Sequence, residues 1–323
     1  LMLLGYDLVK ANDAKDVQLN IEYRLKQPEQ LLEAGAIVAK QQFAVRENTA
    51  AALTISPAAL KAVKVVDKKK EPQITLQANN FTIQFDRNTG LLSKYEVQGR
   101  SLLGEGGTLQ PCFWRAVTDN DMGAESQKRF AAWRTPEMKL TSISVDKKTK
   151  TVRANYELPA VKASLCLTYQ ADEAGALTVT QALTTTPGYD GPEMLRFGMQ
   201  MNLPYDMDQS RWFGRGPIEN YSDRKMSQDV GIYHATADQL FYPYVRPQET
   251  GTMSDLRWWN QANADNTGVR IESDRLFSAS ALHYDLLTLD EGEEKHQRHS
   301  QSLPKSKYTN MFIDLVQSGV GGV

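Results

Sequence analysis

The sequence predicts an all-β protein of the sandwich type, and three observations lead to this fold class. Hydrophobic and polar residues alternate in many short runs, as they do in strands with one buried face. Segments rich in Gly, Pro, Asn and Asp separate these runs at close spacing, which is typical of sandwiches. Long amphipathic helices do not alternate with the runs, so the sequence does not encode a (β/α)8 barrel.

The alternating runs predict the strands in chain order. They cover residues 17–25, 81–85, 152–158, 165–169, 177–179 and 197–203. Because alternate side chains of a strand point to opposite faces, one set in each run should lie between sheets. Six residues predicted to be buried in this way are Phe81, Phe85, Leu165, Leu167, Met199 and Met201.

Two short helices are also predicted. One covers residues 125–133, where Phe130 and Trp133 could share one face, and the other covers the charged stretch 290–299.

A charged run that ends in proline predicts a linker at residues 67–72. It divides the chain into a smaller unit, 1–66, and a larger unit, 73–323. The smaller unit is short for an independent sandwich, so we interpret it as the last part of a domain.

Composition excludes several classes of partner. The 323 residues include 37 Lys and Arg against 39 Asp and Glu, a net charge of -2, which gives no electrostatic footprint for nucleic acid or anionic lipid. No run of 18 apolar residues occurs, so we expect no membrane-spanning helix. Cys112 and Cys166 are too few for a disulfide framework and are expected to be free, buried thiols. The sequence fits a soluble protein of either the cytoplasm or the periplasm.

No metal site or cofactor site is predicted. The stretch that starts at Asp119 resembles a calcium loop at first, but its fifth position is Gly123 and its twelfth is Phe130. His296 and His299, near Glu293 and Glu294, could bind a transition metal, but a solvated charged segment is the favoured interpretation.

Three aromatic segments, at 112–117, 211–217 and 241–247, allow two interpretations. Aromatic faces stack on sugar rings, but the same side chains also build cores and domain interfaces.

Four sequence strings occur together in the order and spacing of one family. They are FTIQFDRNTGLLS (81–93), FWRAVTDNDMG (113–123), WFGRGPIENYSDR (212–224) and YPYVRPQETG (242–251). On these strings the chain resembles the C-terminal part of large bacterial β-galactosidases of glycoside hydrolase family 2.

The resemblance implies a fold for each unit. Residues 73–323 would form the family's small-chain domain, a large galactose-mutarotase-like β-sandwich (a supersandwich) that is incomplete at its C-terminal end. Residues 1–66 would be part of an immunoglobulin-like β-sandwich whose last strands contain Phe43, Val45, Leu53 and Ile55.

The resemblance also implies a function. The family hydrolyses β-galactosides with retention, using two Glu residues on a barrel that precedes this region, so no catalytic residue is assigned here. The chain alone should therefore be inactive, with the barrel domain or subunit and the carbohydrate substrate as partners and a homo-oligomer as a further assembly. The complete enzymes often use Mg and Na, at sites mostly outside this region. A sugar-site Trp of the family would lie beyond Val323.

Two groups of site residues follow. The resemblance places a loop with Asp119, Asn120, Asp121 and Gly123 beside the galactose site. Gly123 could act as a hinge for a mobile segment 124–133, the alternative being a surface turn. The second group is a structural motif in which a carboxylate–guanidinium pair would hold the loop. Its residues are Arg215, Glu219, Asn220, Asp223 and Arg224.

Two other functions are alternatives to this one. An autonomous carbohydrate-binding module would need the aromatic segments to be exposed. A mutarotase-like epimerase would need a general acid and base, usually His and Glu, facing a groove.

Overall fold

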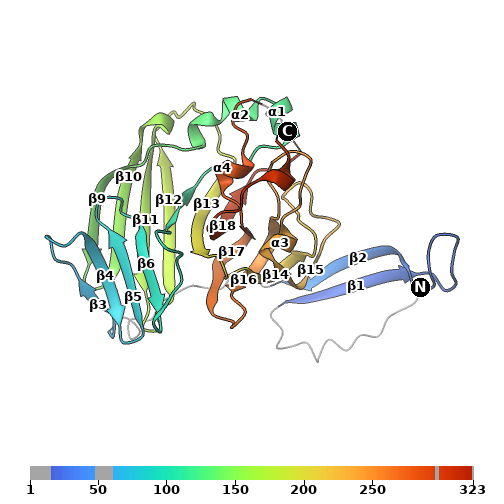
Figure 1. Cartoon of the computed structure of the whole chain (residues 1–323), viewed down its shortest axis with the longest axis horizontal. Helices are drawn as coiled ribbons and strands as arrows, with labels where there is room; N and C mark the ends of the chain where they lie inside the picture. Colours follow the sequence, from blue (N-terminus) through green and yellow to red (C-terminus); the bar gives the residue numbers. More distant parts are fainter. Residues whose placement is uncertain (1–15, 48–60, 295–297, 322–323) are drawn as a thin grey trace.

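Two antiparallel sheets and a separate two-stranded ribbon form the framework of the described residues (Figure 1). The computed structural model describes residues 16–47, 61–294 and 298–321. The all-β sandwich predicted from the alternating runs is confirmed.

The larger sheet has twelve strands, all paired with antiparallel neighbours. In spatial order they are β15 (Asp229–Thr236), β14 (Gln209–Gly216), β16 (Met253–Ala262), β17 (Gly268–Leu282), β18 (Tyr308–Gln317), β13 (Arg196–Pro204), β8 (Leu109–Cys112), β6 (Leu92–Val97), β5 (Phe81–Asp86), β4 (Gln73–Ala78) and β3 (Lys64–Val66), with β7 (Arg100–Ser101) beside β6.

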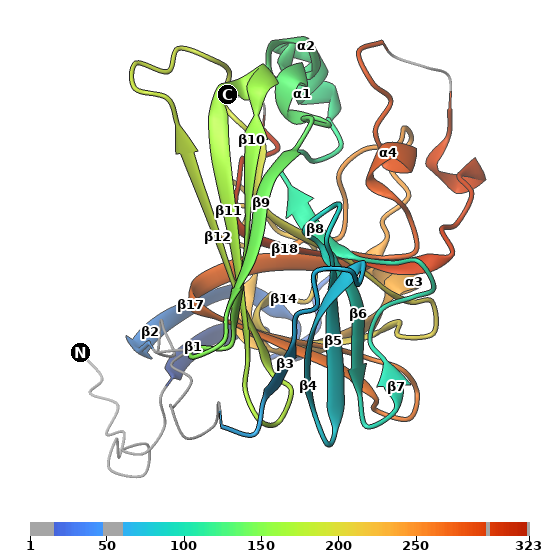
Figure 2. The same cartoon turned by 90° about the vertical axis from the view of Figure 1, so that its left-hand side faces the viewer.

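A four-stranded sheet packs against one end of the larger sheet (Figure 2). Its strands are, in spatial order, β12 (Leu177–Thr185), β11 (Ala163–Ala171), β10 (Thr151–Leu158) and β9 (Lys139–Asp146). The rings of Phe85 and Tyr169 meet between the two sheets, with centroids 4.8 Å apart. The six residues predicted to be buried, on β5, β11 and β13, are all at most 8% exposed, so the predicted core is confirmed.

The ribbon pairs β1 (Val17–Arg24) with β2 (Ile37–Arg46) and lies beside β15 (Figure 1). Lys40 Nζ lies 2.7 Å from Asp229 Oδ2, and the Gln42 side chain bonds both backbone groups of Val230. No second layer of described residues covers the ribbon. Its exposed apolar side chains are Leu19, Tyr23, Ile37, Val38, Phe43 and Val45.

The predicted linker at residues 67–72 lies between two strands of the larger sheet. Strand β3 pairs with β4, so the larger sheet already begins at Lys64, and residues 67–72 connect two of its neighbouring strands. Arg87 fixes this connection through an ion pair with Asp67. Of the strands expected in the smaller unit, Phe43 and Val45 lie on β2, while Leu53 and Ile55 lie outside the described residues.

The helices are short, and several gather at one end of the sandwich near residues 317–321 (Figures 1 and 2). They are α1 (Asp119–Gly123), α2 (Ser126–Arg129), η2 (Ala131–Trp133), η3 (Pro159–Val161), α3 (Ala237–Leu240), α4 (Leu286–Leu289) and η4 (Ser300–Ser302). Over the described ranges, no helix has the length and apolarity to cross a membrane.

The helix predicted at 125–133 is present as α2 and η2, but the helix predicted at 290–299 is wrong for the described part of that stretch. Helix α4 ends at Leu289, and Gly292 has a φ of 84°. Asp290 and Glu291 are buried and paired with Arg134 and Arg246, so tertiary ion pairs fix this backbone. The interpretation as a solvated segment concerned Glu293, Glu294, His296 and His299, and the three of these that the structure describes, Glu293, Glu294 and His299, are exposed.

Candidate functional site

Helix α1 begins within the loop predicted at Asp119, and local capping explains why. Thr118 Oγ1 accepts the N–H of Asp121 at 3.2 Å, and Asp121 Oδ2 accepts the N–H of Thr118 at 2.7 Å. This capping box satisfies two backbone donors that the first helical turn leaves unpaired. Asp121 is buried and also binds Arg115. The distance from Asp121 Oδ2 to Arg115 Nη1 is 2.5 Å.

The backbone argument for a hinge at Gly123 is wrong. Gly123 is the last residue of α1 and its φ is not positive; the left-handed residue of this segment is Glu125, with a φ of 56°. The following residues, predicted to be loosely held, include buried Ser126, Gln127 and Trp133. Trp133 Nε1 donates to the carbonyl of Pro192 at 2.7 Å.

We expect Gly123→Ala to leave the melting temperature unchanged or slightly raised. A Cβ at Gly123 would meet no atom within 4 Å, and alanine stabilises a helix relative to glycine by up to about 1 kcal/mol. Thermal unfolding of the two proteins, followed by circular dichroism, tests this expectation. A clear drop in melting temperature would contradict the described conformation.

The second group of predicted residues forms a bonded loop after β14. Arg224 Nη2 lies 2.6 Å from Glu219 Oε1, so the structure brings together a carboxylate–guanidinium pair in this motif. Glu219 also accepts the N–H of Gly251 at 2.7 Å. Buried Asn220 accepts the N–H of Ser254 at 3.0 Å. These bonds tie the loop to the start of β16.

Arg215 lies apart from this pair. Its Nε is 2.5 Å from Asp255, and its Nη1 donates to the carbonyl of Gln228 at 2.7 Å. Lys225 approaches the same carboxylate at 2.8 Å. Burial raises the pKa of Asp255, but hydrogen bonds from Lys225 and Arg215 outweigh it and lower the pKa overall.

The loop around α1 holds the carbonyl groups of residues 319 and 320. Arg115 Nη2 donates to the carbonyl of Gly319 at 2.6 Å. Asn120 Nδ2 and Thr118 Oγ1 donate to the carbonyl of Val320 at 3.1 and 3.4 Å. Arg115 thereby binds Asp121 and Gly319 with one guanidinium group.

The loop after β14 holds the same segment from the other side. Asp223 accepts the N–H of Val320 at 3.1 Å and the N–H of Gly321 at 2.7 Å. Ser222 Oγ donates to the carbonyl of Gln317 at 3.3 Å. Residues 319–321 therefore lie in a cradle, which we define as Arg115, Thr118, Asn120 and Asp223. The cradle unites one residue from each predicted group, Asn120 and Asp223, with Arg115 and Thr118.

A third motif reaches helix α1 through Arg246. Arg246 lies 2.6 Å from Glu291 through Nη2 and 3.6 Å from Asp119 through Nε. Its Nη2 is also 3.5 Å from Met122 Sδ. The strings at 113–123, 212–224 and 242–251 thus meet at one end of the sandwich, whereas the string at 81–93 lies on β5 and β6.

Below the cradle lies a buried charged cluster of Arg196, Glu249 and Asp314. Arg196 Nη2 is 3.3 Å from Glu249 Oε1, and Arg196 Nε is 3.1 Å from Asp314 Oδ2. All three side chains are at most 5% exposed. Burial would lower the pKa of Arg196, but the two carboxylates outweigh it and raise the pKa. Burial raises the pKa of Asp314 to about 7, although Arg196 acts in the opposite direction.

The Asp314 pKa predicts a pH dependence of stability. Between about pH 4 and pH 7 the folded state retains a proton on Asp314 that the unfolded chain has lost, so this group stabilises less as pH rises. We expect wild type to lose stability relative to Asp314→Asn over this range, since asparagine does not titrate. Melting temperatures measured in parallel across the range test this, and a pH-independent difference would contradict it.

Sequence reasoning missed Arg196, Glu249, Asp314, Arg246 and the pair Asp290 and Glu291. Asp290 and Glu291 stand inside a charged run, where no local pattern separates a buried carboxylate from a solvated one. Glu249 and Arg246 lie within the family string at 242–251, and that string could have identified them as candidate site residues. His296 lies outside the described residues. Within the described ranges, no three His, Cys, Asp or Glu side chains form a metal-ligand set.

Of the seven aromatic side chains in these segments, Phe113, Trp114 and Trp212 are buried, whereas Phe213, Phe241 and Tyr244 are half-buried. Trp114 and Trp212 are fully buried, and Trp212 stacks on Trp259 with ring centroids 5.1 Å apart. Tyr242 is 59% exposed. The packing interpretation is therefore correct for the tryptophans, and the exposed aromatic surface required of a carbohydrate-binding module is not formed by them. Cys112 is a buried free thiol as predicted, whereas Cys166 is half-buried.

Comparison with known proteins agrees with the four strings. The family described as "Beta galactosidase small chain" matches residues 77–323. The chain belongs to this family. The small-chain match includes every residue of the cradle and of the buried charged cluster.

Relatives of this small-chain protein are named "Beta-galactosidase". The chain is 31% identical to one from Priestia megaterium, over 99% of this chain and 30% of that protein. It is 30% identical to one from Lactobacillus delbrueckii subsp. bulgaricus, over 93% of this chain and 30% of that protein. It is 27% identical to one from Vibrio cholerae, over 90% of this chain and 28% of that protein. The chain therefore spans about 30% of the length of these curated relatives.

Proposed function

We propose that this chain is the non-catalytic C-terminal region of a retaining β-galactosidase of glycoside hydrolase family 2. In this proposal it shapes the mouth of an active site whose two catalytic Glu residues lie on a barrel domain or subunit. The substrates would be terminal β-galactosides, as the names of the relatives suggest.

The observation that carries the proposal is the cradle. Two loops from different strings of the family hold the backbone of residues 319–321 through five hydrogen bonds. A segment that contributes to a substrate site must be held in a fixed position, because small displacements are costly to catalysis. The resemblance implies that the 119–123 loop lies beside the galactose site, and this implication is part of the proposal.

The buried cluster supports a non-catalytic role. A retaining glycosidase needs two carboxyl groups about 5–5.5 Å apart that both reach the substrate. Glu249 and Asp314 share Arg196 as a partner, but they are 5% and 1% exposed and cannot reach a sugar. Burial is the reason that this pair does not form an active site.

The ribbon supports a second proposal, that the unit before Lys64 belongs to an immunoglobulin-like sandwich. A two-stranded ribbon is marginal in water, and exposed apolar side chains such as Tyr23 and Phe43 call for a covering layer. We propose that further strands of the sandwich supply this layer.

The decisive experiment compares three proteins with a chromogenic β-galactoside. They are the chain 1–323, the product of the complete parent reading frame, and that product lacking this region. Only the complete product should give turnover. Turnover proportional to the purified chain, made in a host without β-galactosidase, would overturn the non-catalytic assignment. A complete product without a barrel and without turnover would overturn the family function.

In the complete product, Asp223→Ala is expected to lower kcat/KM about tenfold to a hundredfold. The substitution removes both acceptors for the N–H groups of Val320 and Gly321, so the segment at the mouth loses its fixed position. Asp223 is exposed, so the melting temperature should change little. Steady-state kinetics measures the effect, with Asp274→Ala, an exposed carboxylate on β17, as the control. Equal kinetics for both variants would contradict the role of the cradle.

A further inference from the structure

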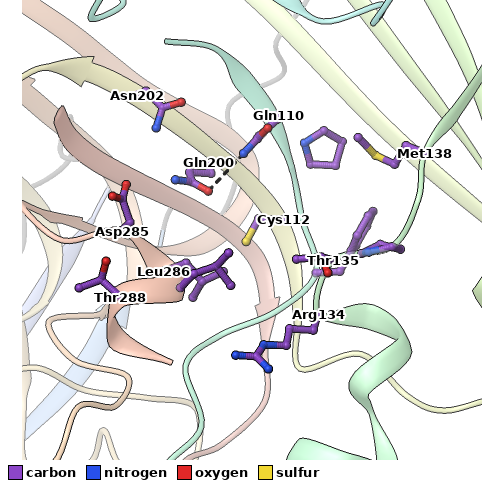
Figure 3. A pocket seen from close by; sticks show the side chains of 14 residues that line it. Gln110, Cys112, Arg134, Thr135, Met138, Gln200, Asn202, Asp285, Leu286 and Thr288 are labelled. Carbon is purple, nitrogen blue, oxygen red and sulfur yellow. Dashed lines mark hydrogen bonds between the residues drawn. The ribbon is translucent and has the colours of Figure 1, made fainter. Parts of the chain in front are cut away.

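A pocket of about 610 Å³ opens between β8, β13, helix α4 and the connection from η2 to β9 (Figure 3). This volume lies within the range of about 300–1,000 Å³ typical of small-molecule sites. Figure 3 shows Gln110, Gln200 and Asn202 on the strands, with Leu286 and Thr288 of α4 on another side.

The strand side of the pocket is a row of amide side chains. Gln110 donates to Gln200 at 3.5 Å, Gln200 donates to Asn310 at 3.3 Å, and Asn202 donates to the same Asn310 oxygen at 2.9 Å. Gln200 and Asn202 are 9% and 8% exposed. A primary amide has two N–H donors and an acceptor with two lone pairs, so each lining amide retains hydrogen-bonding capacity. This spare capacity suits a ligand that carries polar groups.

The charged groups of the pocket are already neutralised or bonded. Arg134 Nε lies 2.7 Å from Asp290, which also accepts the indole N–H of Trp114 at 2.6 Å. Asp285 accepts the hydroxyl of Ser306 at 3.1 Å. Because Arg134 is paired with Asp290, the lining offers a ligand no unpaired cation. This pairing disfavours phosphorylated ligands, which need unpaired cations.

The other walls carry apolar side chains beside polar ones. Pro136 and Met138 lie on the connection to β9 with Thr135, and Leu286 lies on α4 with Thr288. The pocket thus combines neutral hydrogen-bonding groups on the strand wall with both C–H surfaces and hydroxyl groups on the others. The lining residues contain no histidine and no glutamate, so the acid and base of a mutarotase-like epimerase are not found in this pocket.

We propose that this pocket binds a neutral saccharide of one or two rings. Each sugar hydroxyl both donates and accepts a hydrogen bond, which matches amides that offer both, and the ring C–H groups match the apolar side chains of the other walls. The inference goes beyond the proposed function and does not depend on it, because it concerns only residues of this chain.

The test is a titration of the chain 1–323 with lactose, followed through the side-chain amide signals of its glutamines and asparagines by nuclear magnetic resonance. We expect saturable shifts of the Gln110, Gln200 and Asn202 signals. Gln110→Met should weaken lactose binding about three- to tenfold, the effect of one lost hydrogen bond. Its single 3.5 Å bond to Gln200 means that the fold should tolerate the change, which the melting temperature checks.

The matched control is Gln84→Met on β5. Gln84 is also half-buried and also makes a single 3.5 Å side-chain bond, to Thr75, but it lies outside the pocket. Its affinity for lactose should equal that of wild type. Three outcomes would overturn the proposal: no saturable shift up to the solubility of lactose, equal weakening by both variants, or tighter binding of glucose 6-phosphate than of lactose. None of these outcomes bears on the β-galactoside assay of the complete product.

Discussion

Arg196→Met is expected to lower the free energy of unfolding by about 3–5 kcal/mol. Methionine fills a similar volume, but it leaves Glu249 and Asp314 buried without a cation. The guanidinium also lies over the ring of Phe312, with its central carbon 4.7 Å from the centroid, so a cation–π contact is lost too. Urea unfolding at pH 8, where Asp314 is largely ionised in the folded protein, measures the loss.

Arg275→Met is the matched control for this variant. Arg275 is 63% exposed and pairs with the neighbouring, equally exposed Asp274, so its replacement should change stability by no more than about 0.5 kcal/mol. If both substitutions cost the same, the buried cluster does not stabilise the fold in the way its geometry indicates. At pH 5 the cost of Arg196→Met should be smaller, because Asp314 can take up a proton.

Asp121→Asn is expected to cost about 3 kcal/mol or more of stability, the second large effect. The substitution preserves the shape of the side chain but leaves the fully buried Arg115 without its countercharge. It also weakens the acceptor at residue 121 for the backbone N–H of Thr118, the residue that precedes α1. Because Arg115 also binds the carbonyl of Gly319, amide hydrogen exchange should accelerate in both α1 and residues 319–321.

Asp119→Asn gives the same chemical change two residues away. Asp119 is 61% exposed, and the guanidinium of Arg246 lies 3.6 Å from it. The free energy of unfolding should therefore change by about 0.5 kcal/mol at most, with exchange at 319–321 unaffected. Accelerated exchange at residues 319–321 in this control would contradict the prediction, because loss of a negative charge from α1 would then be sufficient without loss of the Asp121–Arg115 pair.

The sheets could be predicted from sequence because the period of two is a local property. The alternating run at 81–85 identifies the buried face of β5, and the run at 152–158 does the same for β10. The ribbon shows the limit of this reasoning. The run at 17–25 does form β1, yet Leu19 and Tyr23 are exposed, because alternation predicts which side chains share a face and not whether another layer covers it.

The site was predictable only as separate pieces. Asn120 and Asp223 were identified as members of two loops, but their meeting around Val320 depends on contacts 200 and 97 positions apart. The hinge at Gly123 stays a prediction, but its backbone premise is not met here, because glycine permits unusual backbone angles without requiring them and this residue completes a helical turn.

Strand β18 joins the two parts of the larger sheet, although it is the last strand of the chain. Its neighbours are β17 on one side and β13 on the other, and β13 leads through β8 to the strands formed by earlier residues. Without residues 308–317, the strands β14–β17 have no described backbone pairing with the remainder of the sheet.

This arrangement sets an order of events when the protein is synthesised. Until the ribosome has released residues 308–317, both β13 and β17 present an unpaired edge, and the buried amides and charges of β18 are not yet in place. Open edges of this kind pair readily with other chains. A nascent chain that stalls before β18 should therefore depend on chaperones. Once the ten residues of β18 are released, they pair with β13 and β17, and residues 319–321 can then bind their loops.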